Sequence, residues 1–202
     1  MTYNDIDPKK QAFIFELDNV LYPEKDYLFQ VYYLFAGMIE YTELWDAKAM
    51  TSLMTQTYQE HGHEAVFDAL KQKFGIDEKY RCNFDDMLIT SKLPLKLLLF
   101  QRMLELLQQI VVDRKKIFVV TNGNPQQQLN KIKQTEWNGL EPYLTCYFAD
   151  EISAKPEPDA VNQLLADHNI ERRQAVMIGV TEADEQCAQA ACIDFVISQR
   201  FL

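Results

Sequence analysis

Five short apolar segments, separated by stretches of helical periodicity, constrain the fold of this chain more than any other feature of its sequence. They are rich in β-branched and aromatic side chains and span residues 12–17, 116–120, 146–149, 175–179 and 193–197. Segments that are apolar along their whole length are typical of strands buried on both faces of a parallel sheet. Their alternation with helices predicts a doubly wound, Rossmann-like α/β fold.

Helical patterns fill the intervals between the later segments, over residues 93–112, 125–137, 158–168 and 182–191. Residues 21–93 break the alternation, because they show helical patterning and no convincing strand. The methionine and aromatic residues of this stretch are predicted to form the core of a small helical bundle: Phe29, Tyr32, Tyr33, Phe35, Met38, Tyr41, Trp45, Met50 and Met54. We therefore predict an α/β core from residues 1–20 and 94–202, with an α-helical domain inserted at 21–93.

The composition excludes several classes of protein. Of the 202 residues, 48% are hydrophobic, which is enough for a packed core and excludes global intrinsic disorder. The 30 acidic residues outnumber the 20 basic residues, and the formal net charge is −10. This surplus disfavours nucleic acid and an anionic membrane surface as partners, because both require a basic face. A small ligand, with or without a bound metal ion, is compatible with it.

The sequence shows no targeting segment. Its N-terminal stretch is polar and lacks the apolar core of a signal peptide. The most apolar stretch, residues 93–112, is interrupted by charged and amide side chains, which favours an amphipathic helix over a membrane span. Cys82, Cys146, Cys187 and Cys192 lack Cys-x-x-Cys spacing and are expected to be reduced thiols. We therefore expect a cytoplasmic protein.

Polar residues follow the predicted strands at their carboxyl ends, where an open parallel sheet binds its ligands. The first strand ends at Glu16 and Asp18, two carboxylates on one face of the extended chain. Buried like charges repel, so such a pair usually needs a cation or a shared proton. The second strand ends at Thr121, Asn122 and Gly123, a hydroxyl group followed by a turn whose backbone N–H groups can bind an anion.

Two further segments contribute charged residues. Lys155 precedes a proline shortly before a predicted helix, and Glu182 and Asp184 follow the strand that ends at Gly179. Each feature alone is common, because strand-end acids cap turns, Thr-Asn-Gly forms ordinary turns and most lysines are solvated. The order of the features along the chain is the more specific signal.

That order resembles the haloacid dehalogenase-like hydrolase superfamily, most of whose members are Mg²⁺-dependent phosphatases. The similarity rests on four motifs, at residues 15–22, 119–123, 155–156 and 178–184. The helical insertion lies where the family has its cap domain. The sequence Asn-Val-Leu-Tyr-Pro at residues 19–23 is similar to members with α-helical caps that act on nucleotides or small phosphate esters. The resemblance therefore implies a small phosphorylated molecule as the ligand, bound between core and cap.

The resemblance also implies catalytic roles. In the family a leading Asp attacks phosphorus, and a second Asp two residues later protonates the leaving group and then activates water. Glu16 and Asp18 occupy these two positions in this sequence. Lys155 would be the third catalytic residue, because it neutralises the charge of the phosphoryl group.

Ligand-binding roles follow from the same motifs. The hydroxyl group and backbone amides of the second motif hold the phosphoryl oxygens in the family, with the lysine beside them. The resemblance therefore assigns phosphate binding to Thr121, Asn122, Gly123 and Lys155. It implies Mg²⁺ as the cofactor, with metal ligands from Glu16, the Asp18 carbonyl and Asp184.

Two central positions depart from the family pattern. Glu16 replaces the nucleophilic Asp, and its extra methylene moves the attacking oxygen by on the order of 1 Å, a misplacement that can cost ~10²-fold in rate. Val180 replaces a metal-binding Asp and offers no ligand atom, although Glu182 is an adjacent candidate substitute. The segment between Asp150 and Lys155 is also shorter than in the family.

These departures leave two functions open. One is a weak or inactive Mg²⁺-dependent phosphatase for a small phosphate ester or nucleotide. The other is a non-catalytic pseudoenzyme that binds a phosphorylated ligand or a protein partner. Hydrolytic dehalogenation, a further reaction of this fold, also needs the leading Asp and is disfavoured by Glu16.

Overall fold

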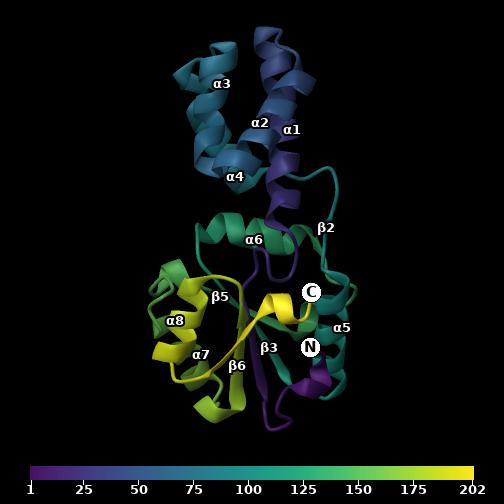
Figure 1. The fold of residues 1–202 in the computed structure, drawn as a ribbon, viewed down its shortest axis with the longest axis vertical. Helices are drawn as coiled ribbons and strands as arrows, with labels where there is room; N and C mark the ends of the chain where they lie inside the picture. The colour runs from purple at the N-terminus through teal and green to yellow at the C-terminus, as the bar shows by residue number, and fades with distance from the viewer. The chain divides into compact units, whose positions relative to one another are not determined.

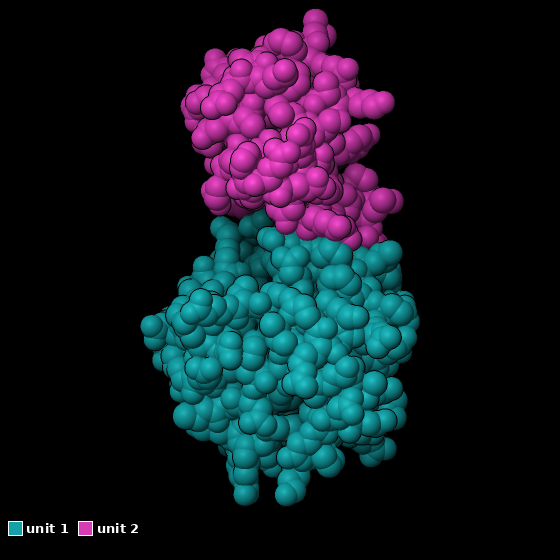
Figure 2. Space-filling view, in the orientation of Figure 1, with its two compact units in different colours: residues 1–24, 97–202 teal, residues 25–96 magenta.

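The computed structural model describes residues 1–202 and divides them into two compact units (Figures 1 and 2). Unit 1 comprises Met1–Glu24 and Leu97–Leu202, and unit 2 comprises Lys25–Lys96. Unit 2 is thus one continuous segment, inserted after the first strand of unit 1.

Unit 1 contains a five-stranded parallel sheet in the order β5-β3-β1-β6-β7. Its strands are β1 (Ala12–Phe15), β3 (Lys116–Thr121), β5 (Leu144–Phe148), β6 (Ala175–Gly179) and β7 (Asp194–Ile197). Each strand arises from one of the five apolar segments, so the predicted doubly wound α/β fold is confirmed. Strand β1 is central in the sheet and fully buried.

Helices cover both faces of this sheet, which explains why its inner strands are apolar throughout. Alternate strand residues, including Ile14 and Phe118, pack in one cluster with helices α7 (Asp159–Asp167) and α8 (Glu182–Ala190). Helix α5 (Gln101–Val112) lies on the opposite side of the sheet (Figure 1). The side chains that α5 buries are Met103, Leu106, Leu107 and Ile110.

Two short strands correct the predicted helix boundaries. Strand β2 (Leu97–Leu98) pairs with β4 (Thr135–Glu136), so the predicted helices at 93–112 and 125–137 were too long. Helix α5 starts only at Gln101, because Pro94 disfavours helical backbone in the residue before it and the β2 pairing follows. Helix α6 spans Pro125–Gln134. In its last turn, the Ile132 carbonyl accepts a hydrogen bond from the indole N–H of Trp137, which lies beyond the helix.

Unit 2 contains four α-helices and no strand: α1 (Glu24–Glu43, whose first residue belongs to unit 1), α2 (Ala47–His61), α3 (Val66–Phe74) and α4 (Arg81–Thr90). Tyr32 and Phe35 are buried, as are the methionines of α2. The prediction of Tyr33, Tyr41 and Trp45 as core residues is wrong, since these residues are 61%, 88% and 42% exposed. None of the helices in the structure combines the length and apolarity needed to cross a bilayer.

Candidate active site

The residues predicted to form the site lie at the carboxyl edge of the sheet. Glu16 and Asp18 follow β1, Thr121 ends β3, Lys155 comes after β5, and Asp184 lies in the first turn after β6. These four strands are parallel neighbours in the sheet. Their carboxyl ends therefore meet at one edge, which brings residues distant in the sequence together.

Glu16 is a buried residue, 8% exposed, and both of its carboxylate oxygens have partners. Oε1 accepts hydrogen bonds from the Leu17 backbone N–H at 2.6 Å and from the Thr121 hydroxyl at 2.5 Å. Oε2 forms an ion pair with the ammonium group of Lys155. Burial raises the pKa of Glu16, and the charge of Lys155 opposes this shift. Three donors within the chain thus hold the residue predicted to be the nucleophile.

Lys155 links two of the carboxylates. Besides Glu16, its Nζ contacts Asp184 Oδ1 at 2.5 Å and the Val120 carbonyl oxygen at 3.1 Å. An ammonium group has three N–H donors, so all of them have acceptors within the chain. Burial would lower the pKa of Lys155, but attraction by Glu16 and Asp184 outweighs it and raises that pKa above its ordinary value. Lys155 is therefore protonated at neutral pH.

Asp184 is almost completely buried, with 1% of its surface exposed. Its Oδ2 accepts from the backbone N–H groups of Val180 at 3.0 Å and Thr181 at 2.9 Å. Gly179 permits this close approach, because a Cβ at that position would lie 2.5 Å from the Asp184 Cβ. Burial alone would raise the pKa of Asp184, but Lys155 and the two N–H donors lower it below its ordinary value.

Asp18 is held by a second lysine, which the sequence motifs do not predict. Its Oδ2 accepts from Lys131 Nζ at 2.6 Å and from Gln128 Nε2 at 3.0 Å, and its Oδ1 accepts from the Tyr22 hydroxyl at 2.6 Å. Lys131 and Gln128 lie three residues apart on α6, and each is 3% exposed. The sequence indicated these two residues only through their three-residue spacing, which places two polar side chains on one face of the helix after the Thr-Asn-Gly turn.

Gln128 joins Asp18 to the rest of the site. Its Nε2 lies 2.7 Å from Thr121 Oγ1, and the Thr121 hydroxyl in turn donates to Glu16. The resulting polar network is continuous and runs in order through Asp18, Gln128, Thr121, Glu16, Lys155 and Asp184.

Asn122 and Gly123, two of the predicted phosphate-binding residues, form bonds within the chain. The Asn122 side chain donates to the Lys155 carbonyl and accepts from the Lys155 N–H, both at 2.9 Å. The Gly123 N–H donates to Asp150 Oδ1 at 3.0 Å. With the Thr121 and Lys155 contacts, every predicted phosphate-binding residue has a polar partner in the structure.

Glu182 does not replace the acid that is missing at Val180. Its carboxylate lies on the exposed side of α8, where it accepts a hydrogen bond from Gln186 Nε2 at 2.7 Å. The Val180 backbone N–H binds Asp184, but its side chain carries no polar atom. The site therefore has one carboxylate, Asp184, from this motif.

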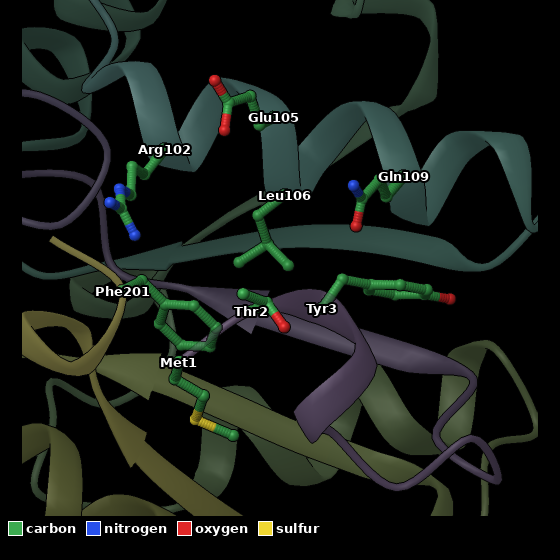
Figure 3. Close-up of a pocket in the computed structure, with 8 residues that line it drawn as sticks. All are labelled: Met1, Thr2, Tyr3, Arg102, Glu105, Leu106, Gln109 and Phe201. Atoms are coloured by element: carbon green, nitrogen blue, oxygen red, sulfur yellow. The ribbon is translucent and has the colours of Figure 1, made fainter.

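A cavity of about 100 Å³ lies elsewhere in unit 1. It is lined by both chain ends and by α5, including Tyr3, Arg102, Leu106 and Phe201 (Figure 3). None of the predicted site residues lines it, so this cavity is separate from the candidate active site.

The sequence matches the family model of haloacid dehalogenase-like hydrolases over residues 13–198. The chain belongs to this family. A search of curated protein sequences finds no significant match. Family membership establishes the hydrolase scaffold.

Solved structures show the same haloacid dehalogenase-like fold at low sequence identity. A magnesium-bound protein assigned as a HAD-hydrolase, YfnB of Bacillus subtilis, aligns with a TM-score of 0.62 and 16% identity over 92% of this chain and 85% of that chain. A defluorinating L-2-haloacid dehalogenase aligns with a TM-score of 0.60 and 14% identity over 94% and 83% of the two chains. A protein of Lactobacillus plantarum assigned as a phosphoglycolate phosphatase gives 0.56 and 20% over 94% and 86%. These similarities concern the fold, and the reaction must be inferred from the site.

The side chains at the candidate active site do not provide the oxygen ligands that Mg²⁺ needs. The ion requires near-octahedral oxygen ligation, usually with carboxylates among its ligands. Here Val180 supplies no oxygen, while Glu16 and Asp184 direct oxygens at the ammonium group of Lys155. No three His, Cys, Asp or Glu side chains converge in the structure as metal ligands. Lys155 supplies the positive charge between the two carboxylates.

Proposed function

We propose that this chain is a degenerate phosphatase, a family member that binds a small phosphate ester or nucleotide but has little or no Mg²⁺-dependent phosphoryl-transfer activity. The observation that carries the proposal is that no acid replaces the one missing at Val180, because the Glu182 carboxylate lies on the exposed side of α8. The remaining motif acids Glu16 and Asp184 both pair with Lys155.

Glu16 supports the proposal through its contacts as well as its length. A nucleophilic carboxylate must direct a lone pair at phosphorus, and bonds within the chain already occupy three of the roughly four lone pairs of Glu16. Its extra methylene adds a displacement on the order of 1 Å, which can reduce the rate ~10²-fold. Attack by Glu16 is therefore limited to the remaining lone pair on Oε2 and requires a shift of the carboxylate.

Asp18 supports the proposal in the same way. Its two oxygens accept hydrogen bonds from Lys131, Gln128 and Tyr22. A general acid must hand its proton to the leaving group at hydrogen-bond distance. The three bonds leave Asp18 about one lone pair, on Oδ1, for that proton.

A slow phosphatase with Glu16 as its nucleophile is the second candidate. It is favoured by the convergence of Glu16, Thr121 and Lys155 at one strand end, because the family uses groups of these types in phosphoryl transfer. In that case Lys155 would neutralise the phosphoryl charge after releasing one of its carboxylate partners.

Restoration of the missing acids tests the proposal. We would measure Mg²⁺-dependent hydrolysis of an aryl phosphate by the native protein and by the double variant Glu16→Asp with Val180→Asp. We expect the native rate at background and the double variant at least ~10²-fold above it. Glu16→Ala with Val180→Asp is the matched control and should stay at background. A double variant no faster than this control would contradict a degenerate site on an intact scaffold.

A further inference from the structure

Two loops at the carboxyl edge of the sheet lie together because the strands before them pair in register. In the pair of β3 and β5, Thr121 lies opposite Phe148. Two residues further along each chain, Gly123 and Asp150 meet in a hydrogen bond of 3.0 Å from the Gly123 N–H to Asp150 Oδ1. The contact therefore follows from the register of the central sheet.

This contact differs from those of the other predicted phosphate-binding residues. The Thr121 hydroxyl and the Lys155 ammonium are tied to buried carboxylates, and the Asn122 side chain is tied to backbone. Asp150, in contrast, is an exposed residue. Breaking a buried charge pair leaves an uncompensated charge, whereas an exposed carboxylate regains water when it moves away. The Gly123 N–H is therefore the donor that this site can release most easily.

The Asp150 carboxylate occupies the place of an anionic ligand on that donor. Backbone N–H groups in turns bind the oxygens of phosphates and carboxylates alike. Gly123 has φ of +101°, a conformation that favours glycine, and it lies in the turn that leads into α6. A phosphoryl group approaching the same N–H would meet both an occupied donor and a like charge.

We propose that Asp150 is a specificity-determining residue that competes with the phosphoryl group for the Gly123 N–H. The inference rests on the proposed function, because it takes the Thr-Asn-Gly turn as the phosphate-binding element. Asp150 makes the site discriminate against free inorganic phosphate. A phosphate ester can displace the carboxylate because the rest of the molecule supplies further binding contacts, which inorganic phosphate lacks.

Inorganic phosphate is the probe for this inference, and isothermal titration calorimetry measures its affinity. Asp150→Ala frees the Gly123 N–H and removes one negative charge, so we expect phosphate to bind about tenfold more tightly than to the native protein. Asp150→Asn keeps an acceptor oxygen but removes the charge, and an intermediate affinity is expected. Glu151→Ala makes the same change in net charge at the adjacent exposed position and should stay within about twofold of native.

Each outcome of the titrations is informative. Competition by Asp150 would be supported if phosphate bound most tightly to Asp150→Ala, less tightly to Asp150→Asn, and least tightly to the native protein and Glu151→Ala. Equal affinities for native and Asp150→Ala would overturn the role of Asp150 and leave the proposed function intact. Equal gains in Asp150→Ala and Glu151→Ala would overturn it as well, because net charge alone would explain them. Failure of every folded variant to bind phosphate would overturn both the inference and the proposed phosphate site.

Discussion

Each of the three carboxylates described at this site forms an ion pair with a lysine. Glu16 and Asp184 share the ammonium group of Lys155, and Asp18 has its own lysine, Lys131. A buried ion pair contributes little relative to well-packed apolar residues, but removal of one partner costs about 3–5 kcal/mol because the other charge stays buried. The protein therefore depends on these contacts for stability, whatever reaction the site performs.

We expect Asp184→Asn to lower the free energy of unfolding by about 3 kcal/mol at neutral pH, because it leaves Lys155 with one carboxylate fewer. Glu185→Gln, at an exposed position on the same helix, should change it by less than about 1 kcal/mol. Urea unfolding of the native protein and both variants measures these differences.

The same variant has an expected pH dependence. The folded-state pKa of Asp184 lies below its ordinary value, so its stabilisation is present above about pH 4 and is lost as the pH falls through the folded-state pKa. The stability difference between native and Asp184→Asn should therefore shrink in acid. A difference that stays constant to below about pH 3 would contradict an ionised Asp184 in the folded site.

The sequence predicts part of the residue-level arrangement. Glu16, Thr121, Lys155 and Asp184 follow strands that a doubly wound fold brings to one edge, and the structure joins them in one network. Lys131 could not be identified in this way. It lies on an amphipathic helix, where a lysine is normally solvated, and only its buried contact with Asp18 reveals its place.

At the scale of elements, the junction of β6 and α8 determines where Asp184 lies. Thr181 caps the helix through its side chain, and the missing Cβ at Gly179 leaves room for the Asp184 side chain. The sequence predicts this strand and helix to within one residue, because a continuous apolar run and a helix cap are strong local signals. Strands β2 and β4 could not be predicted, since two residues carry no periodicity and their partners are far apart in the chain.

Two glycine substitutions test this junction. Gly179→Ala would place a Cβ 2.5 Å from the Asp184 Cβ, so we expect it to lower the free energy of unfolding by about 1–3 kcal/mol. Gly37→Ala is the matched control, because a Cβ inside α1 at that position meets nothing within 4 Å. It should raise the free energy of unfolding by roughly 0.5–1 kcal/mol through the helical preference of alanine. Equal effects of the two changes in denaturant unfolding would contradict the close approach at Gly179.

At the scale of the whole molecule, the sequence specifies the fold more strongly than it specifies the reaction. The fold is shared with solved structures at 14–20% identity, among them proteins named as phosphatase and as dehalogenase. Apolar patterning over long stretches specifies such a fold, whereas a reaction depends on a few side chains at one sheet edge. The net charge of −10 likewise says nothing of which carboxylates are paired. Here the paired ones include the acids that the family motifs predict to be catalytic.

We infer that the site supports no Mg²⁺-dependent reaction, because Val180 supplies no ligand atom and Lys155 pairs with both Glu16 and Asp184. The most direct test is the rate of aryl phosphate hydrolysis by the native protein with and without Mg²⁺, measured beside Glu16→Ala. We expect equal, background rates for the native protein in both conditions and for the variant. A Mg²⁺-dependent native rate that disappears in Glu16→Ala would contradict it.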